Sequence, residues 1–256
     1  MGKEKKELAK TEGGALAPRP DYIGEGNEGM EQMRPQDLVL PRIKLLQALS
    51  PEVAEGDMKA GTMVNTLTGE VVVEKDETIE FVPVQHYLEW IEWAPRSSNQ
   101  GIIDRSRDAQ SELAMRSAAG ESVEVDGRKK FVVTEYHNFV VAVPSLGLDV
   151  AGLIVLSCNR SSHKRGKQLL SLARFRGKCP LFAGRYKLSS TQETNKNNES
   201  YYNYVIKNAG WATEEEFAAL KQVHESLQQV TVSTEQEDEP DAAGPSGDKP
   251  SGDGDF

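Results

Sequence analysis

Alternating polar and apolar positions predict a series of β-strands through the middle of the chain. Residues 78–84 alternate in this way, and residues 87–93 are aromatic enough to form another strand. Asp126-Gly127 is a hairpin-turn dipeptide that separates residues 122–125 from residues 129–133. Further strands are predicted at 135–143, 149–157, 181–189 and 201–207. The run at 149–157 is almost entirely apolar, which suits a strand that is buried on both faces.

Two other windows follow the helical period. Residues 162–176 form the first helical window, and Gly177 is placed to end it as a C′ glycine. Thr213 and Glu216 have the spacing of a capping box and open a second helix with an apolar face. The polar stretch 101–121 is predicted to be either an excursion or a short helix around residues 109–115.

This order of elements predicts a mainly β fold with minor α. It matches a five-stranded Greek-key barrel of the OB type with added strands, a helix between strands 3 and 4, and a C-terminal helix. In such barrels the face of strands 2 and 3 and the loops between strands 1–2 and 4–5 bind oligonucleotides. A larger mixed sheet unrelated to that barrel would give a similar order, and this alternative stays open.

Composition divides the chain into three parts. Residues 1–36 are rich in Gly, Glu and Lys without a helical or strand period, which predicts a disordered N-terminal arm. Residues 37–229 contain the predicted elements and form the core. Residues 230–256 consist largely of Ser, Thr, Glu, Asp, Gly and Pro and are predicted to be a disordered acidic tail.

Several classes of protein are excluded by composition. Cys158 and Cys179 are the only cysteines and have no zinc-finger spacing, so a disulfide scaffold is not expected. The longest nearly apolar run, Val150 to Cys158, is too short for a transmembrane helix. The first ten residues have no apolar segment behind their basic residues. We therefore expect no membrane association and a cytoplasmic location, in the host cytoplasm if the protein is viral.

Charge is distributed very unevenly along the chain. Residues 235–256 hold eight acidic residues against Lys249 alone, a net charge of −7 within the chain's total of −10. By contrast, no acidic residue occurs between Ala151 and Lys187. This basic block contains nine cationic residues, namely Arg160, Lys164, Arg165, Lys167, Arg174, Arg176, Lys178, Arg185 and Lys187. The two segments hold opposite electrostatic potentials within one chain.

Phosphate oxygens are the natural partner of this basic block. In a helix over 162–176, Lys164, Lys167 and Arg174 fall on one face and the leucines on the other. Lysines and arginines that neutralise phosphates release condensed counterions, which favours binding. The alternative is a solvated basic face without a ligand.

Aromatic residues are interleaved with these cations. Candidates for stacking on the bases of a single strand are Tyr136, Phe175, Tyr186 and Tyr202. Tyr186 and Tyr202 are the preferred candidates because they have polar or charged neighbours in the sequence. Many aromatics in a β-rich core serve only packing, and this alternative applies to each ring.

The end of the chain, Asp253-Gly254-Asp255-Phe256, combines carboxylates with a terminal aromatic residue. A lone apolar residue at the end of a disordered chain suits a pocket on a partner protein. This arrangement resembles that of bacteriophage-type single-stranded DNA-binding proteins, which have an OB-fold core and an acidic C-terminal tail ending in Phe. The bacterial members have Pro-Phe at the tip, whereas this chain has Gly254 between the two aspartates. The resemblance implies that Asp253, Asp255 and Phe256 bind replication or recombination proteins.

Signatures of enzymes are absent from the sequence. No P-loop, zinc-protease, nucleophile-elbow or dinucleotide motif occurs. The four histidines are scattered, and no pair has metal-ligand spacing. Glu80, Glu89 and Glu92 could in principle hold Mg²⁺ for a nuclease, but glutamates on a strand surface are usually solvated. We therefore expect no catalytic residues, no metal, no cofactor and no enzymatic activity.

The sequence favours a protein that coats single-stranded DNA without sequence preference during phage replication, recombination or repair. One alternative is a single-strand annealing protein or recombination mediator. Another is a phage protein-binding factor, a DNA mimic or host inhibitor that does not bind DNA. The sequence does not determine the oligomeric state, and a homo-oligomer is possible.

Overall fold

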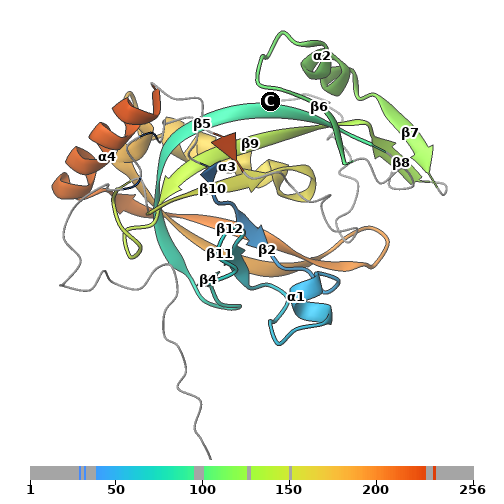
Figure 1. Ribbon diagram of the computed structural model, residues 1–256, viewed down its shortest axis with the longest axis horizontal. Helices are drawn as coiled ribbons and strands as arrows, with labels where there is room; N and C mark the ends of the chain where they lie inside the picture. Colours follow the sequence, from blue (N-terminus) through green and yellow to red (C-terminus); the bar gives the residue numbers. More distant parts are fainter. Residues whose placement is uncertain are drawn as a thin grey trace, which may run out of the picture.

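The computed structural model describes residues 29, 32, 39–94, 101–125, 128–149, 152–228 and 233–234 (Figure 1). Its mainly β architecture confirms the predicted fold class. The strands that build the central sheet are β5 (Ile79–Trp93), β6 (Ile102–Ser106), β9 (Val133–Ala142), β10 (Leu153–Cys158), β11 (Gly184–Thr194) and β12 (Ser200–Trp211). The smaller sheets contain β1 (Val39–Leu40), β2 (Ile43–Leu45), β3 (Met63–Asn65), β4 (Val71–Val73), β7 (Ser122–Val125), β8 (Arg128–Phe131) and β13 (Ser233–Thr234). The helices are α1 (Pro51–Ala54), α2 (Glu112–Ala119), α3 (His163–Arg174) and α4 (Glu214–Gln228), and there are 3₁₀ turns η4 (Arg160–Ser162) and η5 (Leu181–Ala183).

The central sheet is organised around β5. Its strands follow the order β10-β9-β5-β11-β12, and β6 pairs with the far end of β5. All of these pairs are antiparallel. β5 pairs with β11 through residues 79–81 and with β9 through residues 82–92, so this one strand joins the two halves of the sheet.

The sequence predicted β5 as two strands, 78–84 and 87–93, and this division was wrong. The register with β9 shifts between Pro83 and Gln85, so a bulge interrupts the pairing without ending the strand. Bulges accommodate a proline because its missing N–H cannot contribute to the ladder. Gln85 and His86, which lie between the two predicted strands, are part of the continuous strand.

The OB-type barrel stays a prediction, because the central sheet of the described residues is an open path of strands. With β5 as strand 1, the path is 3-2-1-4-5, and α3 lies between the third and fourth strands as predicted. A direct pair between β10 and β12, which would close such a barrel, is not among the strand pairs of the described residues. The segment around β2 lies between them instead, because Arg42 bridges to Val155 and Tyr204 donates its hydroxyl proton to the Ile43 carbonyl at 3.1 Å.

Both faces of the sheet are buried where β5, β9 and β10 run together. One face packs into the main core with α3, through residues such as Phe81, Phe139 and Leu169. The opposite face is covered by α4. Its Leu220, Val223 and Leu227 pack on the residues of the sheet that alternate with those of the main core. Residues of β10 are buried on both sides, which confirms the expectation from its apolar sequence.

The predicted helix boundaries are close to the observed ones. Helix α3 ends at Arg174 with Phe175 as its C-cap, so Gly177, with a φ of +94°, lies one residue beyond the predicted C′ position. Thr213 and Glu216 form the predicted capping box at the start of α4, with side chain to backbone bonds of 2.8 and 3.2 Å. None of the helices in the described part of the chain has the length and apolarity needed to cross a membrane.

The two ends of the chain are described only in part. Of the predicted arm, residues 1–36, only two positions are described, so the expected disorder lies outside the described residues. Ser233 and Thr234 form β13, which pairs in parallel with β1. The predicted tail boundary at residue 230 therefore precedes a strand, and residues 235–256 lie outside the described residues.

Candidate nucleic-acid interface

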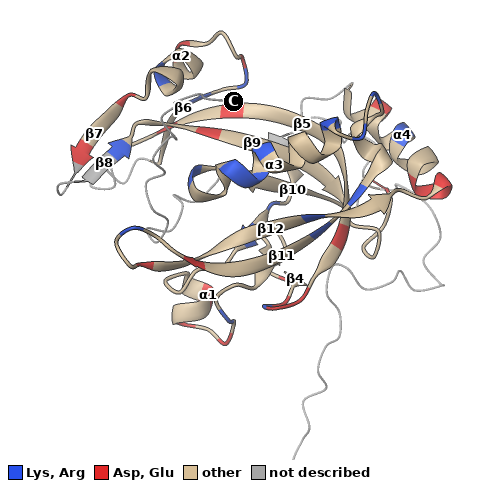
Figure 2. Ribbon diagram, turned by 180° about the vertical axis from the view of Figure 1, so that it is seen from behind, with Lys and Arg blue, Asp and Glu red and all other residues tan. Residues whose placement is uncertain are grey.

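Helix α3 presents a basic face, as its sequence pattern predicts. Lys164, Lys167 and Arg174 are exposed, whereas Leu169 and Gly166 are buried against the sheet. The helix packs against β9 and β10 on one side and against β12 on the other. Figure 2 shows the positive residues along this helix. The fold therefore turns the apolar residues of α3 inward and its lysines toward solvent.

Part of the basic block has no acidic partner among the residues that the structure describes. No ion pair with a described residue is formed by Arg160, Lys164, Lys167, Arg174 or Lys178. An unpaired cation keeps its charge available for a phosphate group. These five residues are the cations best placed to bind an anionic ligand.

The remaining cations of the block are engaged, which the local sequence did not indicate. Arg165 binds Glu193 at 2.6 Å, and Lys187 lies 3.5 Å from Glu80. Arg185 bonds to Glu80 at 2.9 Å and also to Glu216. The Glu216 bond raises the pKa of Arg185, and the same bond lowers the pKa of the Glu216 carboxyl. Acidic residues distant in sequence thus neutralise cations within a block that has no acid of its own.

Arg176 lies between two aromatic rings. Its guanidinium carbon is 4.9 Å from the ring centroid of Tyr186 and 4.7 Å from that of Trp211. Trp211 is 59% exposed and the neighbouring Phe175 is 89% exposed. The exposed rings and their cations form what we call the aromatic-basic patch, which consists of Arg174, Phe175, Arg176, Lys178 and Trp211. Sequence reasoning missed Trp211, although its exposure beside an arginine makes it a candidate for base stacking.

Two of the predicted stacking residues do not fit that role. Tyr136 and Tyr186 are fully buried, so neither ring can receive a base. Tyr186 packs on Phe81 in the main core, with ring centroids 5.8 Å apart. Tyr202 is half-buried, and its ring lies so close to Gly61 that a Cβ there would be 2.6 Å from it. Phe175 is the one predicted ring whose surface is widely open.

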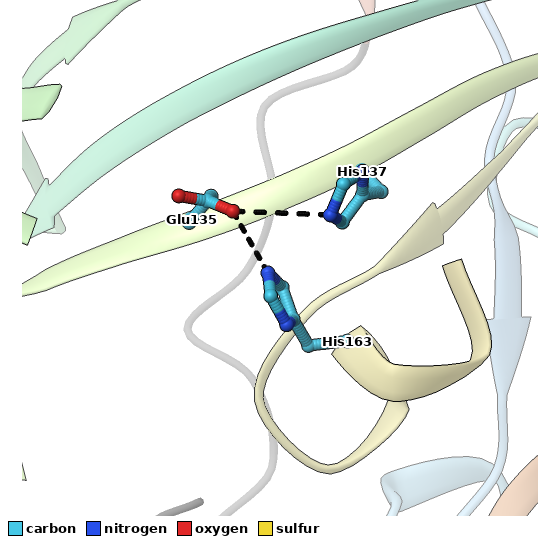
Figure 3. A group of neighbouring side chains, drawn as sticks. All are labelled: Glu135, His137 and His163. Atoms are coloured by element: carbon cyan, nitrogen blue, oxygen red, sulfur yellow. Dashed lines mark hydrogen bonds and ion pairs between the residues drawn. The ribbon is translucent and has the colours of Figure 1, made fainter. Parts of the chain in front are cut away.

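Three of the four histidines, His86, His137 and His163, gather at the start of α3 although they are far apart in sequence. Figure 3 shows two of them, His137 and His163, beside Glu135. His163 Nε2 donates to Glu135 Oε1 at 2.9 Å, and His137 Nε2 lies 3.8 Å from the same oxygen. His86 Nε2 and His137 Nδ1 share a hydrogen bond of 3.1 Å. The prediction that the histidines are scattered therefore holds along the chain but not in space.

The environment of this cluster sets its charge state. The hydrogen bond from His163 lowers the pKa of Glu135 to about 2, so this side chain is a carboxylate. Burial lowers the pKa of His137 to about 4, which keeps its imidazole neutral at pH 7. A carboxylate beside a neutral imidazole can accept a cation or a proton.

The three glutamates considered for Mg²⁺ are held apart by arginines. Glu80 is paired with Arg185, and Glu92 receives a bidentate bond from Arg116 at 2.8 Å for both contacts. Glu89 is 1% exposed and lies between Arg42 and Arg107. In the part of the chain that the structure describes, these carboxylates do not form a metal cluster.

The tip residues Asp253, Asp255 and Phe256 lie outside the described residues. Comparison with known proteins gives one match, to the family described as Pam3 phage gp34-like protein, over residues 10–233. Neither the curated proteins nor the solved structures contain a match to this chain. The matched region spans the whole described core up to β13 and stops before the acidic tail.

Proposed function

We propose that this chain, which belongs to the Pam3 phage gp34-like proteins, binds single-stranded DNA without sequence preference during phage replication or recombination. The aromatic-basic patch carries the proposal, together with the unpaired cations of α3. In this proposal the protein has no chemistry of its own, and the acidic tip recruits other proteins.

The electrostatic part of the argument rests on five cations. Lys164, Lys167 and Arg174 lie on the exposed face of α3, with Arg160 before the helix and Lys178 after it. None of them is neutralised by a described acidic side chain. A row of free cations along one helix matches the spacing of charges along a nucleic-acid backbone better than it matches a single small anion.

The aromatic part of the argument distinguishes single strands from duplexes. Phe175 and Trp211 are largely exposed, so their rings are accessible to a ligand. Unpaired bases stack on such rings, and each stack contributes about 1–3 kcal/mol regardless of the base. Paired bases in a duplex have no free face to offer. The combination therefore favours single strands and supports little sequence preference.

The strand order gives further support by analogy. Barrels of the OB type are common carriers of single-strand binding, and the path of β10-β9-β5-β11-β12 agrees with theirs. A fold by itself does not define a function, so this point is secondary to the patch.

Fluorescence anisotropy with labelled oligo-dT tests the proposal. We expect the full chain to bind with micromolar or tighter affinity, to bind a mixed-sequence strand about equally, and to bind a duplex of that sequence much more weakly. The logarithm of the binding constant should fall linearly with the logarithm of the salt concentration.

Failure to bind would contradict the proposal if it also occurs for a variant that lacks residues 235–256. That result would favour the protein-binding alternative, in which the tail mimics DNA. Faster pairing of two complementary strands in the presence of the protein would instead identify the annealing alternative.

A further inference from the structure

The cluster at the start of α3 has the composition of a metal site. Glu135 and His137 occupy alternate positions on β9, so both side chains point to the same side of the strand. His163 is the first residue of α3 and faces them (Figure 3). Two imidazoles and one carboxylate form a ligand set found in zinc and other transition-metal sites.

The distances between the three ligand atoms suit one metal ion. Tetrahedral Zn²⁺ with bonds of about 2.0–2.1 Å separates its ligand atoms by about 3.3 Å. Glu135 Oε1 lies 2.9 Å from His163 Nε2 and 3.8 Å from His137 Nε2, values on either side of this separation. All three ligand atoms lie within 4.8 Å of one another. Small rotations of the side chains are enough to place an ion between them.

His137 provides an independent indication of a ligand. Its side chain is 6% exposed, and its Nε2 atom is buried without a hydrogen-bond partner. A buried polar atom without a partner is destabilising, and a bound cation would satisfy it. The opposite nitrogen, Nδ1, lies 3.1 Å from His86 Nε2. If Nδ1 of His137 carries the proton and donates it to His86, the lone pair of His137 Nε2 points toward Glu135 and His163. Metal-bound histidines are oriented in this way, by a hydrogen bond from the ring nitrogen that does not bind the metal.

Glu135 is oriented in the same way. Trp90 Nε1 donates to its Oε2 atom at 3.2 Å, which leaves Oε1 to face the two histidines. The side chains of Glu135 and His163 are 31% and 26% exposed, so the site is open to solvent on one side. Three protein ligands and an open side leave a coordination position for water.

We propose that Glu135, His137 and His163 bind one divalent transition-metal ion, with Zn²⁺ as the best match. The nitrogen ligands disfavour Mg²⁺ and Ca²⁺, which prefer oxygen. The ion ties the first residue of α3 to β9. It therefore fixes the helix that carries Lys164 and Lys167.

Isothermal titration of the chelator-treated full chain with Zn²⁺ tests the proposal. We expect one ion per chain, bound with a micromolar or tighter Kd. Co²⁺ should bind at the same stoichiometry and give the strong visible absorption of a tetrahedral nitrogen–oxygen site. His163→Ala and Glu135→Gln should each weaken Zn²⁺ binding at least tenfold. Glu135→Gln keeps the shape of the side chain, so it remains informative if His163→Ala is poorly folded.

His224→Ala is the matched control. His224 lies on α4, where its Nδ1 atom is 3.1 Å from the Val84 carbonyl oxygen, and it should not affect Zn²⁺ binding. The proposal is wrong if the chain does not bind Zn²⁺ at a free Zn²⁺ concentration 100-fold above a micromolar Kd. It is also wrong if binding survives in both cluster variants or disappears in the control. Because these readouts need no DNA, the result is independent of the DNA-binding proposal.

Discussion

Gly166 of α3 lies directly against His137 of β9, and a Cβ atom at Gly166 would be 2.7 Å from the His137 Cβ atom. The same added atom would be 3.0 Å from the Cβ atom of Cys158. A glycine inside a helix normally costs about 1 kcal/mol relative to alanine, so Gly166 looks unfavourable in the sequence alone. The close approach of helix and sheet explains its presence.

We therefore expect Gly166→Ala to destabilise the protein, opposite to the usual effect of this change in a helix. Overpacking a buried contact costs about 1–3 kcal/mol, which outweighs the gain in helix propensity. Urea unfolding followed by circular dichroism measures the difference. Ser171→Ala, at an exposed position of the same helix, is the control and should be neutral or slightly stabilising. A more stable Gly166→Ala variant would contradict this close packing of α3 on β9.

The second prediction concerns the unpaired cations of α3. Changing Lys164, Lys167 and Arg174 together to Ala should weaken binding to all single strands about equally. The slope of log K against log salt should fall by about 0.7 for each phosphate that is no longer neutralised, or by about 2 if each of the three residues binds one phosphate. Exposed Lys59 and Lys221, changed together to Ala, provide the control. An unchanged slope in a folded triple variant would remove α3 from the binding surface.

The third prediction concerns the exposed rings of the aromatic-basic patch. Trp211→Ala and Phe175→Ala should each reduce the affinity for oligo-dT by about 1–3 kcal/mol, because each removes a stacking surface. Leu67→Ala is the control, because Leu67 is an apolar side chain that is 58% exposed in the turn between β3 and β4. This change should leave the affinity for oligo-dT unaltered. If the wild type and both ring variants bind oligo-dT with equal affinity, the two rings do not stack on bases, and the patch binds DNA through its charges alone.

The fourth prediction concerns pH. The bond with Arg185 lowers the pKa of Glu216 from its ordinary value of 4.5, so this group stabilises the fold above that value. The contribution, about 1.5–3 kcal/mol for a hydrogen bond to a charged group, is lost as the pH falls through the lowered pKa. Glu216→Gln retains the capping box but not the charge. The wild type should therefore be more stable than this variant at pH 7, and the difference should shrink below pH 4.

Unfolding in urea at the two pH values measures this difference. Glu225→Gln, at an exposed position of the same helix, should behave like the wild type at both. A gap between wild type and Glu216→Gln that stays constant with pH would mean that the Arg185 bond contributes nothing as an ion pair.

The fifth prediction concerns the acidic tail. A flexible segment with a charge of −7 competes with DNA for the basic face of its own chain. Deletion of residues 235–256 should raise the affinity for single strands at low salt, and the gain should disappear near 1 M salt because of screening. Removal of Phe256 alone should leave DNA affinity unchanged and abolish recruitment of partner proteins in a pull-down. Weaker DNA binding after the full deletion would show that the tail does not compete.

The pattern of polar and apolar residues was enough to predict most helices and strands, but it did not predict correctly which aromatic residues are exposed. Tyr186 was expected at the surface because Arg185 and Lys187 flank it. In a strand, however, neighbours point to opposite faces, so charged residues on both sides indicate that the residue between them is buried. This reasoning does not extend to Tyr136, because its neighbour His137 is itself buried. Stricter use of the strand period would have corrected the prediction for Tyr186.

The interactions around α3, in the basic block, the histidine cluster and the aromatic-basic patch, join segments that are distant in sequence. The ion pair of Arg165 with Glu193 and the approach of His163 to Glu135 arise only when α3 packs between β9 and β12. The alternate spacing of Glu135 and His137 was the one local signal of a shared site. Trp211 could not be recognised as part of the patch, because its pairing with Arg176 requires the end of β12 to lie beside the end of α3.

The parallel pair of β1 and β13 has a consequence for engineering the protein. It places Val39 beside Ser233, so the chain enters and leaves the described core at neighbouring points. A circular permutant could therefore join these points with a short linker and open new termini in the turn between β11 and β12, near Asn197. All strand pairs of the central sheet would be kept. The core could then be attached to a support through its new termini, at the turn between β11 and β12.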